Sequence, residues 1–183
     1  ATDDLYGGSY RMFTKVFAHF GITFHFVNMN DANDITKHIN AKTKMIWVET
    51  PTNPLMRIID IKATAEIAKK NNLILVVDNT FASPYLQNPL DMGCDIVFHS
   101  ATKYLCGHSD VLMGIVVVKE EKPASLLRGM MVNTGGVAGP MDCALVLRGI
   151  RRGGASVAPG AVGAWRRAAL DQQVQQRAAA QRQ

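Results

Sequence analysis

Leu73-Ile-Leu-Val-Val-Asp78 is the stretch that decides the fold. Five apolar residues in a row are typical of a strand that is buried on both faces, as the strands of parallel sheets are. The preceding segment, residues 61–72, has Ile61, Ala65 and Ala68 at helical spacing, so we expect a helix with these residues on its inner side. A helix followed by a fully buried strand is the repeating unit of an α/β fold.

The alternation of helical and strand patterns extends on both sides of this unit. The helix that includes Tyr10 is expected to end at Gly21, because glycine favours helix termination. We expect strands at 22–27, 44–49, 73–78, 95–100 and 111–119, and helices at 10–20, 32–39, 61–72, 123–132 and 139–150. The sequence therefore predicts an α/β fold with a mainly parallel sheet flanked by helices, and with sites at the C-terminal ends of its strands.

The composition is that of a soluble globular protein. Of 183 residues, 48% are hydrophobic and 19% are charged, and no apolar run approaches the roughly 20 residues that span a bilayer. Cys94, Cys106 and Cys143 do not form a disulfide framework, so we expect reduced thiols. No charged-then-apolar leader opens the chain, and we expect a cytoplasmic protein without a membrane partner.

The net charge of +5 lies in the last part of the chain. Residues 1–150 hold 14 Lys+Arg and 14 Asp+Glu, whereas residues 151–183 hold six Arg and one Asp. The segment 151–183 offers no apolar face, so we predict disorder or a frayed helix there. All ten lysines precede Arg151, which raises the hypothesis of a shifted reading frame. The segment also lacks aromatic residues other than Trp165, and we expect no nucleic-acid partner.

Three polar clusters follow predicted strands. They are Asp78-Asn-Thr80, Ser100-Ala-Thr-Lys103 and Glu49-Thr-Pro-Thr-Asn53-Pro54. The C-terminal ends of parallel strands lie at one edge of a sheet, so all three clusters should open on the same crevice. Two hydroxyls and exposed backbone amides beside a lysine suit a phosphate and an electrophilic carbonyl.

This combination of residues fits pyridoxal 5'-phosphate. The aldehyde of this cofactor needs a lysine for a Schiff base, and its protonated ring nitrogen needs a buried carboxylate. Lys103 and Asp78 would fill these two roles. A carboxylate at the end of a buried strand is costly unless it has a cationic partner of this kind.

Two other kinds of site can be compared with the same residues. Ser100-x-x-Lys103 fits the serine nucleophile of penicillin-binding proteins, which are acyl-enzyme hydrolases. That motif should open a helix and be joined by Ser-Asp-Asn and Lys-Thr-Gly elements, and the sequence contains neither element. Cys94, His99, Cys106 and His108 lack the close pair spacing of structural zinc sites, so we expect no metal.

Four segments resemble the Cys/Met metabolism family of pyridoxal-phosphate enzymes, the trans-sulfuration enzymes that include cystathionine synthases and lyases. They are Tyr6-Gly-Gly-Ser-Tyr-Arg11, Glu49-Thr-Pro-Thr-Asn-Pro54, Val76-Val-Asp-Asn-Thr-Phe81 and His99-Ser-Ala-Thr-Lys-Tyr-Leu-Cys-Gly-His-Ser-Asp110. The resemblance runs through about residues 3–150. It implies the central part of the large cofactor domain of a fold-type I enzyme, similar to aspartate aminotransferase.

The resemblance also implies roles for single residues. Lys103 and Tyr6 would be catalytic, with Lys103 carrying the cofactor and Asp78 lying beside the ring nitrogen. The other implied contacts are Tyr6 stacked on the ring, Ser100 and Thr102 on the phosphate, Asn53 near the ring hydroxyl, Thr80 beside the cofactor, and Arg11 facing a substrate carboxylate.

The implied reaction is γ-replacement or γ-elimination on cystathionine or an O-acylhomoserine, with cysteine as a further small amino-acid substrate. Bacterial cystathionine γ-synthase and γ-lyase are the most similar members, and Gly8 argues against methionine γ-lyase, which tends to carry cysteine there. Cystathionine β-lyase or methionine γ-lyase activity, or a catalytically incompetent fragment, are the alternatives. The family's glycine-rich loop and small C-terminal domain match nothing here, so residues 1–150 would be an incomplete cofactor domain of a homotetramer.

Overall fold

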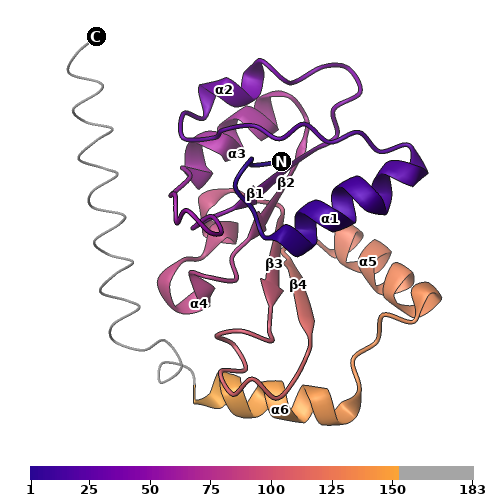
Figure 1. Cartoon of the computed structure of the whole chain (residues 1–183). Coiled ribbons are helices and arrows are strands. Elements are labelled where there is room, and N and C mark those ends of the chain that lie inside the picture. The colour runs from indigo at the N-terminus through magenta and orange to yellow at the C-terminus, as the bar shows by residue number, and fades with distance from the viewer. Residues whose placement is uncertain (153–183) are drawn as a thin grey trace.

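The computed structural model describes residues 1–152. Figure 1 shows a sheet with helices around it and α6 lying across the end of β3 and β4. The elements are α1 (Gly7–Lys15), the 3-10 helix η1 (Phe17–Phe20), α2 (Asn33–Thr36), β1 (Met45–Glu49), α3 (Ile61–Lys70), β2 (Ile74–Asp78), α4 (Ser83–Leu86), the 3-10 helix η2 (Pro89–Met92), β3 (Ile96–Ser100), β4 (Gly114–Val118), α5 (Glu121–Thr134) and α6 (Pro140–Arg151). No helix in this part of the chain is long and apolar enough to cross a membrane.

The sheet confirms the predicted α/β class. Its four strands lie in the order β1-β2-β3-β4; β1, β2 and β3 are parallel, and β4 is antiparallel to β3. The parallel strands are joined through α3 and through α4 with η2, since a parallel pair needs a crossover connection. The connection from β3 to β4, residues 101–113, contains no helix and returns the chain antiparallel.

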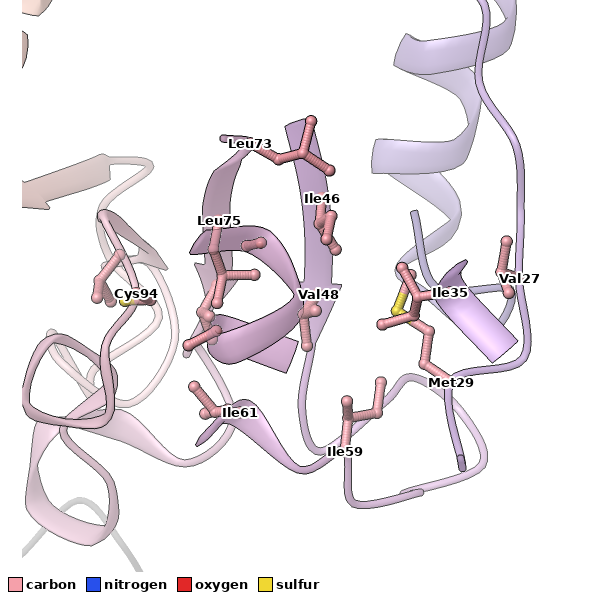
Figure 2. Close-up of a cluster of buried hydrophobic side chains, with 14 residues drawn as sticks. Val27, Met29, Ile35, Ile46, Val48, Ile59, Ile61, Leu73, Leu75 and Cys94 are labelled. Carbon is pink, nitrogen blue, oxygen red and sulfur yellow. The ribbon is translucent and has the colours of Figure 1, made fainter. Parts of the chain in front are cut away.

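One face of the sheet forms the main core. Ile46 and Val48 of β1 and Leu75 and Val77 of β2 are buried there, as period-two alternation along a strand requires. Figure 2 shows Ile46, Val48 and Leu75 in this cluster, with Ile61 at the start of α3. The predicted inner side of α3 is confirmed, because its residues Ile61, Ala65 and Ala68 are all buried.

The opposite face of the sheet carries aromatic residues and packs against α1. The ring of Trp47 lies 5.3 Å from Phe13 of α1 and 5.9 Å from Phe98 of β3, measured between centroids. Phe13 also stacks on Phe24 at 4.5 Å. On this face the apolar residues give way, at the C-terminal ends of the strands, to Glu49, Asp78 and Ser100.

The predicted strand at 22–27 is wrong. Only Val27 makes a bridge, to Thr2, through hydrogen bonds of 3.0 Å from the Asp3 amide to the Val27 carbonyl and 2.9 Å from the Val27 amide to the Ala1 carbonyl. Residues 22–26 alternate like a strand but have no continuous strand beside them, and a strand needs such a neighbour to form a ladder.

Two predicted helices are interrupted or shortened in the structure. The helix expected at 10–20 ends at Lys15 and is followed by η1, which ends at Gly21 with φ of 77° as expected. The helix expected at 32–39 is reduced to Asn33–Thr36, since Asn and Asp compete with the backbone for hydrogen bonds and disfavour helix interiors. Of the tail predicted at 151–183, Arg151 ends α6, and the residues from 153 onward lie outside the described residues.

Candidate functional site

The three polar clusters lie together at the C-terminal edge of the parallel strands, as the sequence predicts. Glu49 and Asp78 are register partners on β1 and β2, and Asp78 is the partner of Phe98 on β3. The Ser100 amide donates a hydrogen bond of 2.8 Å to the Thr80 hydroxyl, which joins the cluster after β3 to the cluster after β2. The edge therefore brings residues from three strands into one site.

Asp78 is a buried carboxyl, with 5% of its surface exposed. The Thr80 amide donates to it at 3.0 Å, and the Thr80 hydroxyl also bonds to it. Burial raises the pKa of Asp78, which means that the charged form is poorly solvated. None of the four ion pairs within residues 1–152 includes Asp78. A carboxyl in this state is suited to receive a cationic group such as a protonated ring nitrogen.

Lys103 lies in a turn directly after β3. Its amide donates to the Ser100 carbonyl at 3.1 Å, and its carbonyl accepts from the Gly107 amide at 2.8 Å, so the backbone around the lysine is fixed. The Thr102 hydroxyl accepts from the Met113 amide at 3.0 Å, which leaves its own hydrogen for another acceptor. Residues 101–106 form turns and no helix, contrary to what a Ser-x-x-Lys acyl-enzyme site requires.

The Lys103 side chain borders an open pocket of about 880 Å³. The pocket lining also includes Thr102, Phe81, Tyr104 and the loop 109–112. Two carboxyls also line the pocket, those of Asp110 and of Asp142 near the start of α6. This pocket is large enough for a cofactor with an attached amino acid, since small-molecule sites range from about 300 to 1,000 Å³.

α6 supports the loop that carries Lys103. Ala101, Cys106 and Val111 of this loop are buried in a second apolar cluster with Val146 of α6. Arg148 of α6 forms an ion pair of 2.5 Å with Asp110, and this pairing lowers the pKa of the Asp110 carboxyl. Sequence reasoning placed a helix here but did not predict this contact.

Tyr6 precedes α1 as its N-cap residue, and its amide donates a hydrogen bond of 2.7 Å to the Glu49 carboxyl. Tyr6 is 52% exposed and does not line the pocket of Lys103. Arg11 is exposed on α1, with one guanidinium nitrogen near Gly7, and it does not line this pocket either. The structure thus ties Tyr6 to the edge through Glu49 and leaves Arg11 on the adjacent helix.

Asn53 lies in the turn after β1 and is half-buried. The Thr52 hydroxyl bonds to the Asp4 carboxyl, and the Leu55 amide donates to the same oxygen at 3.1 Å. These bonds fasten the turn to the segment before α1. The sequence analysis included Glu49 in this motif but gave it no role. The signal that could have identified it is its position at the end of a predicted strand, where the structure shows it to be buried.

The residues at this edge fit pyridoxal phosphate by their donor chemistry. Asp78 offers a buried carboxyl that has no cation partner among residues 1–152, Lys103 offers an amine beside a pocket, and Thr102 offers a hydroxyl hydrogen. Together with the mixed sheet, they are what is expected of a fold-type I domain from the class of pyridoxal-phosphate-dependent enzymes.

The comparisons with known proteins identify the family. The family model described as Cys/Met metabolism PLP-dependent enzyme matches residues 1–152, and the chain belongs to this family. The chain is 47% identical over 149 residues to the cystathionine γ-lyase of Dictyostelium discoideum, covering 81% of the chain and 38% of that protein. It is 50% identical over 150 residues to the cystathionine β-lyase MetC of Bacillus subtilis (strain 168), covering 82% of the chain and 38% of that protein.

A solved structure agrees with these relatives. The cystathionine γ-lyase from Lactobacillus plantarum, complexed with L-serine, superposes with a TM-score of 0.80 at 44% identity, covering 81% of this chain and 39% of that one. The chain thus spans about two fifths of the length of the relatives that it matches. The family and the cofactor agree with the resemblance inferred from the motifs, while the roles of single residues stay predictions.

Proposed function

We propose that the protein is a trans-sulfuration enzyme that catalyses γ-replacement or γ-elimination on cystathionine or an O-acylhomoserine. The observation that carries this proposal is that the buried Asp78 ends β2 and Lys103 follows the neighbouring strand β3 at the same edge of the sheet. Lys103 lines a pocket of about 880 Å³, whereas Asp78 lies outside its lining. When bound, pyridoxal phosphate supplies an electron sink for the carbon next to the amino group of the substrate. Relatives named as γ-lyase and γ-synthase support this choice of reaction.

Each predicted site residue would have its own role in this reaction. Lys103 would bind the cofactor and move protons through its Nζ atom, because a lysine amine can act both as nucleophile and as base. Ser100 and Thr102 would bind the phosphate through their hydroxyls, and Asp78, positioned by Thr80, would bind the ring nitrogen. The remaining proposed contacts are Tyr6 over the ring, Asn53 near the ring hydroxyl, and Arg11 toward the substrate carboxylate.

Product analysis tests the reaction. The chain is incubated with pyridoxal phosphate and L-cystathionine, and the keto acid and thiol products are separated and identified. Release of 2-oxobutanoate and cysteine supports γ-elimination, and conversion of O-acylhomoserine and cysteine into cystathionine supports γ-replacement. Pyruvate with homocysteine would instead favour the β-lyase alternative, which the relative from Bacillus subtilis illustrates. Cofactor bound at Lys103 without any product would favour the catalytically incompetent fragment.

Gly8→Ala tests the proposed place of Tyr6. A Cβ atom at position 8 would lie 2.3 Å from Cε1 of the Tyr6 ring, so the ring must move aside. We expect affinity for pyridoxal phosphate to fall about threefold to tenfold, which is the range of a lost aromatic contact. Stability should change little, since a ring can rotate away. Fluorescence titration with the cofactor measures the affinity.

Gly7→Ala is the matched control for this change. Its Cβ atom would meet only a guanidinium nitrogen of Arg11, at an ordinary distance of 3.8 Å. Both glycines lie in the first turn of α1, so both variants gain the same helix propensity. Equal affinities of the two variants for the cofactor would contradict the proposed place of the Tyr6 ring.

We further propose a cytoplasmic homotetramer for the whole protein. The exposed apolar side chains of α5 support association, because this helix buries no residue and leaves Leu126 at 65% and Met130 at 63% exposure. Sedimentation velocity on the full-length protein tests the oligomeric state, and a monomer at micromolar concentration would contradict it.

A further inference from the structure

Glu49 is a buried carboxyl at the end of β1, with 5% of its surface exposed. One of its oxygens accepts the amide hydrogen of Tyr6 at 2.7 Å. Tyr6 is the N-cap residue of α1 and has no side-chain cap of its own. The Glu49 carboxyl therefore holds the backbone at the residue where α1 begins, in addition to the bonds of Asp4 just before it.

The charged groups that face Glu49 are all acidic. Asp78 on β2 is its register partner, so the two side chains project from neighbouring strands on the same face of the sheet. Asp4, from the segment before α1, also acts on it electrostatically. Within residues 1–152 none of these three carboxyls belongs to an ion pair.

This environment favours the neutral form of Glu49. Burial is the largest cause, and together with the negative charges of Asp78 and Asp4 it raises the pKa of Glu49 to about 8, although the Tyr6 amide acts in the lowering direction. At pH 7 a carboxyl with this pKa is about 90% protonated. A positive charge placed near Asp78 would act in the opposite direction and favour ionised Glu49.

We propose that Glu49 is a positioning residue that anchors Tyr6 through a neutral carboxyl in the empty site and releases its proton to solvent when a cationic ring binds beside Asp78. This inference rests on the proposed function, since the ring is that of pyridoxal phosphate. A hydrogen bond to an ionised acceptor is roughly twice as strong as one to a neutral acceptor. Binding at Asp78 therefore tightens the hold of Glu49 on Tyr6, whose ring is proposed to cover the cofactor.

The raised pKa of Glu49 predicts how the stability of the empty chain changes with pH. Because the folded pKa of Glu49 is above that of the unfolded chain, the folded state binds more protons between about pH 4.5 and 8. Stability is then fully present below the lower value and falls as pH rises through this window. The folding equilibrium constant of the natural chain should fall about tenfold more per pH unit than that of Glu49→Gln. Urea unfolding at several pH values measures this difference.

Glu66→Gln is the control, because Glu66 is an exposed glutamate on α3. It should keep the pH dependence of the natural chain. Equal pH slopes for Glu49→Gln and the natural chain would overturn the neutral state of Glu49.

Carbon-13 labelling of the glutamate carboxyls tests the proposal directly. The chain has four glutamates, and comparison with Glu49→Gln assigns the resonance of Glu49. We expect this one resonance to titrate near pH 8 in the empty chain and to move to its ionised position at pH 7 when pyridoxal phosphate is added. The Tyr6 amide should then exchange with solvent more slowly, and Glu49→Gln should lack this change.

The possible outcomes of this experiment test the neutral state of Glu49, the proton release and the proposed function separately. If all four glutamates titrate below about pH 6, the neutral state of Glu49 is wrong, even if Glu49→Gln fails to fold. If the Glu49 resonance stays at its protonated position with the cofactor attached to Lys103, the proton release is wrong. If the cofactor does not bind, the proposed function fails, while the titration of the empty chain still decides whether Glu49 holds a proton.

Discussion

Asp78→Asn is expected to weaken the binding of pyridoxal phosphate about 100-fold and, at the same time, to make the empty chain more stable. The buried carboxyl is poorly solvated and has no cation partner within residues 1–152. In the empty site the uncharged amide of Asn therefore avoids the cost of burying an unpaired charge. The amide keeps an oxygen to accept the Thr80 amide hydrogen. With the cofactor bound, however, removing one partner of a buried ion pair costs about 3 kcal/mol.

The gain in stability from Asp78→Asn should depend on pH. Burial raises the pKa of Asp78 above its unfolded value, so the stability contributed by its neutral form is lost as pH rises through the folded pKa. The gain from Asp78→Asn should therefore be larger at pH 8 than at pH 4. Urea unfolding without cofactor and fluorescence titration with cofactor measure the two effects.

Asp91→Asn is the matched control, because Asp91 is an exposed aspartate on η2. It should change neither cofactor affinity nor stability by more than about 0.5 kcal/mol. If Asp78→Asn binds the cofactor as tightly as the natural chain, Asp78 is not the partner of the ring nitrogen.

Gly149→Ala is expected to destabilise the fold by about 2 to 3 kcal/mol and to loosen the loop that carries Lys103. A Cβ atom at position 149 would lie 2.3 Å from the Cys106 carbonyl oxygen and 2.4 Å from that of Leu105. These are backbone atoms of a buried turn, which cannot move aside as a side chain can. α6 must then shift off the loop, and such overpacking costs about 1 to 3 kcal/mol.

Hydrogen exchange and urea unfolding check this result. We expect faster exchange at the Cys106 and Gly107 amides, whose bonds to Ala101 and Lys103 fix the turn. Gly129→Ala in α5 is the control, because its Cβ atom would meet nothing within 4 Å. It should stabilise the chain by about 0.5 to 1 kcal/mol through helix propensity. Equal stabilities of the two variants would show that α6 does not rest on this turn.

The central strands and α3 could be predicted because their patterns are unambiguous. Residues 73–78 are wholly apolar before Asp78, and 61–72 have a clear helical period, so both elements form where expected. The segment 22–27 also has a strand-like pattern, but it forms only a single bridge, from Val27 to Thr2. Strand formation depends on neighbours that a local pattern does not specify.

The residues of the site also differ in how far the sequence could predict their placement. Asp78 and Lys103 follow neighbouring parallel strands, so the topology alone brings them to one edge. The contact of Glu49 with Tyr6 spans 43 residues and that of Gly149 with Cys106 also joins distant segments, so neither follows from local sequence. Arg11 was assigned through the resemblance alone, and its exposed place on α1 leaves its role a prediction.

The most direct test of the account is to trap the cofactor on the chain. The purified chain is incubated with pyridoxal phosphate and reduced with borohydride, and the labelled peptide is located by mass, with Lys103→Ala as control. We expect the label to concentrate on Lys103, one of ten lysines, and to be lost in the variant. Label spread over many lysines, or unchanged labelling of Lys103→Ala, would contradict the claim that this edge of the sheet is a pyridoxal-phosphate site.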